Sequence, residues 1–161
     1  MKHLPKYLRP RWRYLGVGIE AHPDAAVDRR SFQRDLWYAA GNLLGDPGSA
    51  DVDCSVYGFS FRDGDGECVV RVRRGEVERA RAVLACLDDV SGHPVRVTVR
   101  GVGGTVRACE ERYLGRPLES ADEKTVVHGN ADRSAVVRGS RVDVRTDDGL
   151  LGATDYDYDY D

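Results

Sequence analysis

Apolar residues alternate with polar residues or glycines in four segments of the chain and recur at helical spacing in two others. Strict alternation predicts half-buried strands, and a spacing of three to four residues predicts amphipathic helices. In chain order, the pattern predicts a strand over 15–21, a helix from Asp28 to Gly45, strands over 52–61 and 67–73, a helix over 76–87 and a strand over 95–100. Asp63 to Gly66 is predicted as the hairpin turn between the second and third strands.

The predicted order is strand, helix, strand, strand, helix, strand, followed by a C-terminal helix. This order is typical of the ferredoxin-like or RRM-like α/β sandwich, an α+β fold in which two helices back an antiparallel four-stranded sheet. The first and third strands are then central neighbours, and the fourth lies beside the first. Trp37 lies at the edge of the apolar stripe of the first helix, and we expect it in the core.

The segment from Arg100 to Leu114 joins the last predicted strand to the last predicted helix. It holds three glycines in four positions, then Thr105 as a helix N-cap and Arg107 in the first helical turn. Free backbone N–H groups at a helix N-terminus beside a guanidinium can bind phosphate or another oxyanion. The alternative is a tight turn in which Thr105 only caps the helix.

Strand alternation places four arginines on the face of the predicted sheet that points away from its two backing helices. The bare backbone of Gly16 and Gly18 lies on the same face, which would make it a basic platform. The alternatives are that these side chains are ordinary solvated positions, or that the last helix covers part of the face. The four residues are Arg71, Arg73, Arg96 and Arg100.

Four parts of the chain are predicted from its composition. Residues 1–13 form a basic arm without acids, in which interleaved aromatic side chains could stack on unpaired bases, unless the arm is simply a solvated chain end. Residues 14–114 form the folded domain. Residues 115–145 are a polar extension that can form a short hairpin around Gly139 and Ser140, and residues 146–161 are predicted as an acidic, disordered tail.

The net charge of −3 is unevenly distributed. Six of the 27 acids and none of the 24 bases follow Arg145, so residues 1–146 hold 21 acids against 24 bases and carry a net charge of +3. Arginine far outnumbers lysine, and aspartate outnumbers glutamate. This bias indicates an organism with high internal salt, where diffuse attraction to nucleic acid is weak and bidentate arginine hydrogen bonds matter more.

Several functional classes are disfavoured by the sequence. No apolar run approaches the ~20 residues of a membrane span, and the first residues lack the apolar core of a signal peptide, so we expect a cytoplasmic protein without membrane contact. The four cysteines form no CxxC pair, and the four histidines are scattered. We therefore expect reduced thiols, no metal site and no catalytic residue in this chain.

Four motifs together resemble the ribonuclease P protein component 2 family of archaea, and the charge bias favours a haloarchaeal member. The resemblance covers about residues 1–114. Residues 115–161 have no counterpart in the family core, and Glu110 and Glu111 stand where many relatives carry bases. In chain order the motifs are Pro10-Arg-Trp-Arg-Tyr-Leu15, Leu36-Trp37, Val70-Arg-Val72 and Gly101-Val-Gly-Gly-Thr-Val-Arg-Ala108.

The resemblance implies an RRM-like subunit that assists a catalytic RNA in removing the 5′ leader from precursor tRNA. Magnesium would be held by that RNA, and no cofactor by this chain. The implied partners are ribonuclease P RNA, ribonuclease P protein component 3 and other ribonuclease P proteins, with precursor tRNA contacted indirectly. Two pairs of this chain and component 3 would join into a heterotetramer.

The expected RNA contacts are all arginines, because a guanidinium can bind phosphate in a bidentate manner. Two other functions stay open. One is an RNA-binding module of a different ribonucleoprotein, and the other is a small acylphosphatase-like enzyme, whose phosphate loop the Gly101–Arg107 segment resembles. The expected contact residues are Arg11, Arg13, Arg71, Arg73, Arg96, Arg100 and Arg107.

Overall fold

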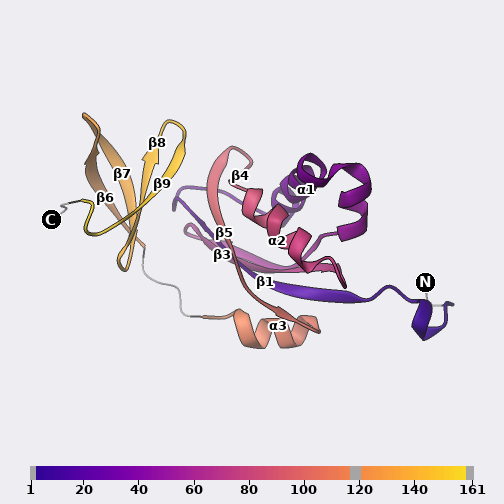
Figure 1. Ribbon diagram of the computed structural model, residues 1–161. Coiled ribbons are helices and arrows are strands. Elements are labelled where there is room, and N and C mark those ends of the chain that lie inside the picture. The colour runs from indigo at the N-terminus through magenta and orange to yellow at the C-terminus, as the bar shows by residue number, and fades with distance from the viewer. Residues whose placement is uncertain (1–2, 117–120, 159–161) are drawn as a thin grey trace.

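A computed structural model describes residues 3–116 and 121–158 of the chain. Within these ranges two antiparallel sheets lie side by side (Figure 1). Helices α1 and α2 cover one face of the first sheet, and α3 lies on its other face. Residues 1–2 of the predicted basic arm and 159–161 of the predicted tail fall outside the described residues.

The first sheet has five strands in the order β2-β3-β1-β5-β4. As predicted, the first strand lies between the third and the last of the long strands, but the sheet has five strands where four were expected. The added strand is a two-residue edge that pairs with the start of β5 after a tight turn. The strands are β1 (Trp12–Ala21), β2 (Ser55–Arg62), β3 (Asp65–Arg73), β4 (Asp89–Val90) and β5 (His93–Gly103).

The hairpin between β2 and β3 turns at Asp63 and Gly64, where it was predicted. Both residues have positive φ, 52° and 79°, which matches the right-handed twist of the flanking strands. The register of β2 against β3 shifts between Tyr57 and Ser60, next to Gly58 with φ of 56°, so β2 contains a β-bulge.

The described residues contain three α-helices and one short 3-10 helix. Asp28 caps α1 as predicted: its side chain accepts a hydrogen bond from Ser31 N at 2.7 Å. Gly45, with φ of 73°, interrupts α1 as a kink but does not end it. No helix in the described ranges is long and apolar enough to cross a membrane. The helices are η1 (Lys6–Leu8), α1 (Arg29–Val52), α2 (Val77–Cys86) and α3 (Val106–Tyr113).

The main core lies between the first sheet and helices α1 and α2. Leu15, Val17 and Ile19 of β1 are fully buried, as their alternation predicted, and Phe32 and Leu36 of α1 pack on the same cluster. Burial of such side chains stabilises the fold by about 1.5–3 kcal/mol each. Trp37, the residue after Leu36, is not part of this core. The expectation that Trp37 is a core residue is wrong, because 54% of it is exposed.

The second sheet lies where a polar extension and a disordered tail were predicted. Its strand order is β6-β7-β8-β9. The hairpin around Gly139 and Ser140 exists and joins β7 to β8, but it is the centre of a larger sheet. The expectation of disorder from residue 146 is therefore wrong for residues 149–154. The strands are β6 (Asp122–His128), β7 (Ala131–Arg138), β8 (Arg141–Thr146) and β9 (Gly149–Thr154).

A second apolar cluster explains why residues 122–154 fold. Val126, Ala135, Val142 and Val144 are buried together, and Tyr158 packs against them. The strand pattern was hard to read from the sequence because β7 is buried on both faces, so that Ala135, Val136 and Val137 are consecutive rather than alternating.

Candidate functional site

Three side chains stack on one another at the N-terminal end of β1. The guanidinium carbon of Arg71 lies 3.8 Å from the centre of the Trp12 ring, and that of Arg73 lies 4.5 Å from it. Arg71 is also 5.3 Å from the Tyr57 ring centre. The register of β1 against β3 brings these residues together, because Trp12 pairs with Arg73 and Tyr14 with Arg71. Contacts of this kind are cation–π interactions and hold the ring and both cations in place.

Two further arginines flank this stack. Arg11 is exposed, and its backbone carbonyl accepts a hydrogen bond from Arg74 N at 2.9 Å. Arg13 brings a guanidinium nitrogen next to Gly104, just before the N-terminus of α3. A carboxylate oxygen of Asp53 lies 3.5 Å from a guanidinium nitrogen of Arg73, so these two residues form an ion pair. We define the strand-end cluster as Arg11, Trp12, Arg13, Arg71 and Arg73.

The C-terminal helix covers the middle of the sheet face that was expected to be an open platform. A Cβ atom built on Gly16 would lie 2.6 Å from Tyr113 Cβ, so α3 packs directly on the bare strand backbone. Arg100 lies beside it and is not available: it forms an ion pair with Glu67 at 2.7 Å and donates to the Tyr113 carbonyl at 2.9 Å. The missing side chains of Gly16 and Gly101 therefore allow α3 to pack closely on the strands, and they do not leave an open backbone that RNA could approach.

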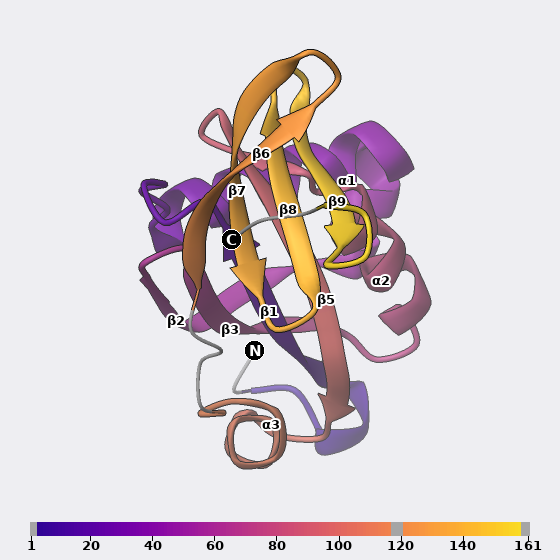
Figure 2. The same ribbon diagram turned by 90° about the vertical axis from the view of Figure 1, so that its left-hand side faces the viewer.

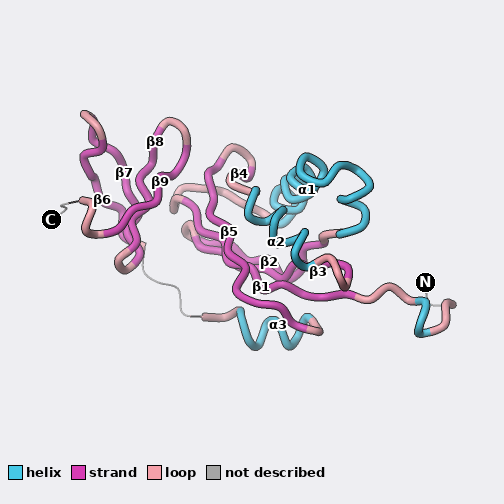
Figure 3. Tube along the Cα trace, viewed as in Figure 1, coloured by secondary structure: helices cyan, strands magenta, loops and turns pink. Residues whose placement is uncertain are grey.

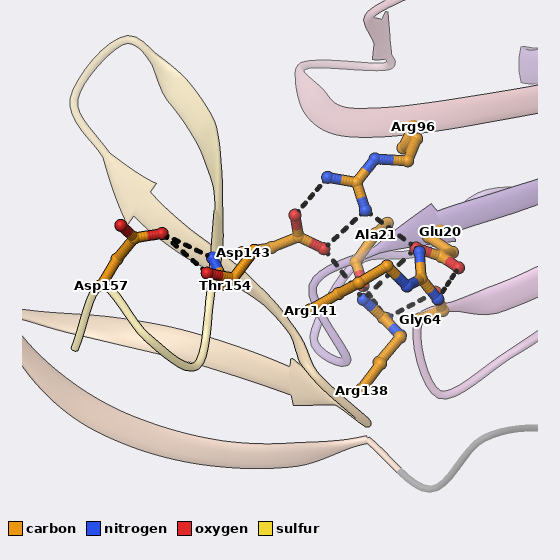
Figure 4. Close-up of polar contacts among 9 residues, drawn as sticks. All are labelled: Glu20, Ala21, Gly64, Arg96, Arg138, Arg141, Asp143, Thr154 and Asp157. Atoms are coloured by element: carbon orange, nitrogen blue, oxygen red, sulfur yellow. Dashed lines mark hydrogen bonds and ion pairs between the residues drawn. The ribbon is translucent and has the colours of Figure 1, made fainter. Parts of the chain in front are cut away.

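The second sheet covers the other end of the same face, where β1 ends (Figure 2). Arg96 donates to both carboxylate oxygens of Asp143 in β8 and to Glu20 in β1 at 3.1 Å (Figure 4). Arg141 forms two hydrogen bonds with Glu20, at 2.8 and 2.9 Å. We call Glu20, Arg96, Arg138, Arg141 and Asp143 the inter-sheet network.

Arg138 is the most deeply buried member of the inter-sheet network, with 2% exposure. It donates to the carbonyls of Ala21 and Gly64 at 2.8 and 3.2 Å and to Asp143 at 3.3 Å. Its two terminal nitrogens make these bonds, while the buried Nε has no partner among the described residues. The bonds fix β7 against the turn that joins β2 to β3 and against the end of β1. The second sheet is therefore a docked part of the molecule.

Two carboxylates near this contact, those of Glu20 and Asp24, have lowered pKa values. Burial alone would raise the pKa of Glu20, but its hydrogen bonds with Arg141 and the nearby charges of Arg138 and Arg96 lower that pKa below its usual value. A hydrogen bond from Arg145 lowers the pKa of Asp24, which also lies 2.9 Å from His22. His22 in turn lies 2.9 Å from Glu123 of β6, so a second set of polar contacts joins the two sheets.

The seven arginines expected to contact RNA fall into three groups. Arg71 and Arg73 lie against Trp12, and Arg11 and Arg13 are the residues on either side of Trp12 in the chain, with Arg13 reaching toward Gly104. Arg96 and Arg100 are bound within the chain, and the expectation of a continuous basic platform is therefore wrong. The structure matches the alternative in which the last helix covers part of this sheet face, and the second sheet covers a further part of the same face.

Arg107 stands apart from the other six and is 88% exposed at its side chain. It pairs with Glu111 one turn along α3, at 2.9 Å. Thr105 caps the helix as predicted, since its hydroxyl accepts from Ala108 N at 3.1 Å. With one helical N–H already satisfied and Arg107 paired along the helix, the geometry matches the tight-turn interpretation of the Gly101–Arg107 segment.

The described residues hold no cluster of three or more His, Cys, Asp or Glu side chains that could bind a metal ion. The thiols of Cys54 and Cys68 are buried, and burial raises the pKa of each to about 12, so neither is a ready nucleophile. What the strand-end cluster can do chemically is bind: it offers guanidinium groups for phosphates and an indole ring for stacking.

Sequence reasoning missed the inter-sheet network because its members come from four separate strands. Arg138 and Asp143 lie in the stretch that was predicted only as a polar extension with a short hairpin. One signal was available in β8, where the sequence Val142-Asp143-Val144 places an aspartate between two valines. In an internal strand, such an aspartate indicates a buried partner of opposite charge. The stack of Arg71 on Trp12 could have been found from the predicted register of the first and third strands.

Comparisons with known proteins agree with the earlier resemblance. The family model described as Rpp14/Pop5 matches residues 13–114. Ribonuclease P protein component 2 of Natronomonas pharaonis is 62% identical over 157 residues, which are 98% of each chain. The protein of that name from Methanosarcina mazei is 32% identical over 114 residues, 71% of this chain and 93% of that protein.

Among solved structures, a chain of yeast ribonuclease MRP is similar at a TM-score of 0.47 and 17% identity, over 60% of this chain and 76% of that one. This likeness is too low to carry weight. The family model and the haloarchaeal relative decide the family of this chain, because the model spans most of the chain and the relative spans nearly all of it. The chain belongs to the Rpp14/Pop5 family.

Proposed function

We propose that this chain is a non-catalytic protein subunit of ribonuclease P in the cytoplasm of a halophilic archaeon, where it assists the catalytic RNA in removing the 5′ leader from precursor tRNA. The observation that carries the proposal is the 62% identity to a ribonuclease P protein component 2 over 98% of both chains. The proposed partners are ribonuclease P RNA and other ribonuclease P proteins, among them component 3 in a heterotetramer, with magnesium bound by the RNA.

The strand-end cluster is the surface that we assign to RNA. Trp12 offers an aromatic ring on which Arg71 and Arg73 stack, Arg13 reaches toward Gly104, and Arg11 precedes Trp12 in the chain. Base stacking on aromatic side chains combined with arginine contacts is how proteins bind unpaired RNA, at about 1–3 kcal/mol per stacked base. The cations lower the repulsion between RNA segments brought together near the active region.

Reconstitution tests the function. Cleavage of precursor tRNA by ribonuclease P RNA with the other protein subunits should become faster at limiting magnesium when this chain is added, because its arginines replace part of the ionic screening. Equal cleavage with and without the chain at every magnesium concentration would contradict the proposal.

The strand-end cluster is tested in the same assay. Arg71→Ala removes one of the two cations stacked on Trp12 and should raise the magnesium concentration needed for half-maximal cleavage. The matched control is Arg62→Ala, on the hairpin at the opposite end of β3, where the side chain is 87% exposed. Identical magnesium curves for Arg71→Ala and the unaltered chain would remove the cluster from the RNA contact.

A further inference from the structure

A groove of about 820 Å³ runs along the outer side of the first half of α1. It lies on the helical face of the first sheet, whereas Trp12 and Arg71 share the face on which α3 packs. Figure 3 shows α1 and α3 on opposite sides of the strands. The groove is lined by Asp28, Arg29, Arg30, Ser31, Gln33, Arg34, Trp37 and Ser91.

The walls of the groove are held in place by hydrogen bonds to β2 and to the chain just before it. The Trp37 indole N–H donates to the Cys54 carbonyl at 2.8 Å, which fixes the ring although 54% of the residue is exposed. Arg29 donates to the Val56 carbonyl at 2.8 and 3.1 Å, and Gln33 bridges Cys54 and Val56. An exposed indole held in one orientation is a preorganised stacking surface.

The charge of the groove is positive. Three arginines and one carboxylate line it, and that carboxylate, Asp28, caps α1 by accepting a hydrogen bond from Ser31 N. Counting also Asp35, the ion-pair partner of Arg34, the three arginines still exceed the acids by one. The helix N-terminus itself is therefore satisfied and is not the anion site. Arg34 is positioned by Asp35 and Ser91, at 3.1 and 2.9 Å, and Arg30 makes no hydrogen bond or ion pair with any residue in the described ranges. Arg30 is thus a cation free to meet a ligand.

We propose that this groove binds an unpaired RNA nucleotide, with its base stacked on Trp37 and its phosphate held by Arg30 and Arg34. A flat aromatic surface beside guanidinium groups fits a nucleotide, since each base has a π-face and each phosphate accepts paired N–H donors. The chain then holds two RNA segments, one on each side of the first sheet. This inference rests on the proposed function only for the source of the RNA.

The two tryptophans of the chain make the test direct, because one lies at each site. In a Trp12→Phe variant, only Trp37 fluoresces, and titration with a short oligouridylate should quench it in a saturable manner. In the Trp12→Phe background, Arg30→Ala should weaken oligouridylate binding by about 5-fold or more. This is the lower end of the effect expected when one contact with a bound nucleotide is lost. The matched control Arg62→Ala, far from the groove, should leave the affinity unchanged within about 2-fold.

Three results would overturn the groove assignment while leaving the proposed function standing. One is quenching of Trp12 in a Trp37→Phe variant together with no quenching of Trp37 in the Trp12→Phe variant. The second is a Trp37 response to another ribonuclease P protein but not to the oligouridylate, which would make the groove a protein interface. The third is stimulation of precursor-tRNA cleavage that Arg30→Ala and Trp37→Ala leave unaltered, with no oligouridylate binding at Trp37.

Discussion

At the scale of single residues, glycines decide how closely the C-terminal helix approaches the first sheet. Gly16 of β1 has no side chain, and Tyr113 of α3 occupies the space that one would fill. The atom nearest to an added Cβ is Tyr113 Cβ, at 2.6 Å, which is fixed to the helix backbone. A larger residue at position 16 therefore requires movement of the whole helix and not only of a side chain.

Gly16→Ala should lower the free energy of unfolding by about 1–3 kcal/mol, as expected for overpacking. Chemical unfolding followed by tryptophan fluorescence measures it. Gly41→Ala is the matched control: it lies within α1 with nothing within 4 Å of the added Cβ, and should raise stability by about 0.5–1 kcal/mol. Equal stability of Gly16→Ala and the unaltered protein would show that α3 does not pack on Gly16 in solution.

At the scale of elements, the second sheet is held to the first by charged groups more than by apolar contact. The side chain of Glu20 is 21% exposed and meets three arginines, two of them on the second sheet. Because its pKa is lowered on folding, its carboxylate contributes stability that is fully present above the unfolded pKa near 4.5. That contribution is lost as the pH falls through the lower, folded pKa.

Glu20→Gln should therefore destabilise the protein by about 1–3 kcal/mol at neutral pH, the range for loss of hydrogen bonds to a charged group. The difference from the unaltered chain should shrink as the pH falls below 4.5. Unfolding curves at a series of pH values measure both effects. Glu78→Gln, at a side chain that is 91% exposed, is the control. A difference for Glu20→Gln that stays constant down to acidic pH would contradict the assigned role of this carboxylate.

At the scale of the whole molecule, the chain is acidic in sum, and arginines gather beside each of its two tryptophans. Much of the remaining positive charge is paired, as in the inter-sheet network and in the ion pair of Arg100 with Glu67. The proposed RNA binding would then depend on a small number of defined phosphate contacts and not on the overall charge. Such binding still responds to salt in proportion to the number of phosphates contacted.

The salt dependence of oligouridylate binding should therefore be shallow. Four phosphate contacts by the arginines of the strand-end cluster give a slope of about −3 in a plot of the logarithm of the binding constant against that of salt concentration. Trp12 fluorescence in the Trp37→Phe variant measures it, and Arg11→Ala should reduce the slope by about 0.7. A slope far steeper than −3 would indicate diffuse binding over the whole surface.

For residues 14–114, the sequence alone determined the types of the long strands and helices, most of the core and the family. Alternation placed Leu15, Val17 and Ile19 in the core and set the turn at Asp63 and Gly64, because these features depend on local backbone preference and on burial of one strand face. The resemblance carried by residues 1–114 also indicated the family, since it rests on motif order and not on contacts.

Only the tertiary structure decided which arginines are free. Alternation correctly directed Arg71, Arg96 and Arg100 to the same side of the sheet, but a strand pattern says nothing about what covers that side. The cover comes from α3 and from a second sheet whose strands lie far along the chain. The partners of Arg96 and Arg100 are thus set by long-range packing, and so is the exposure of Trp37, whose indole is fixed by a carbonyl 17 residues away.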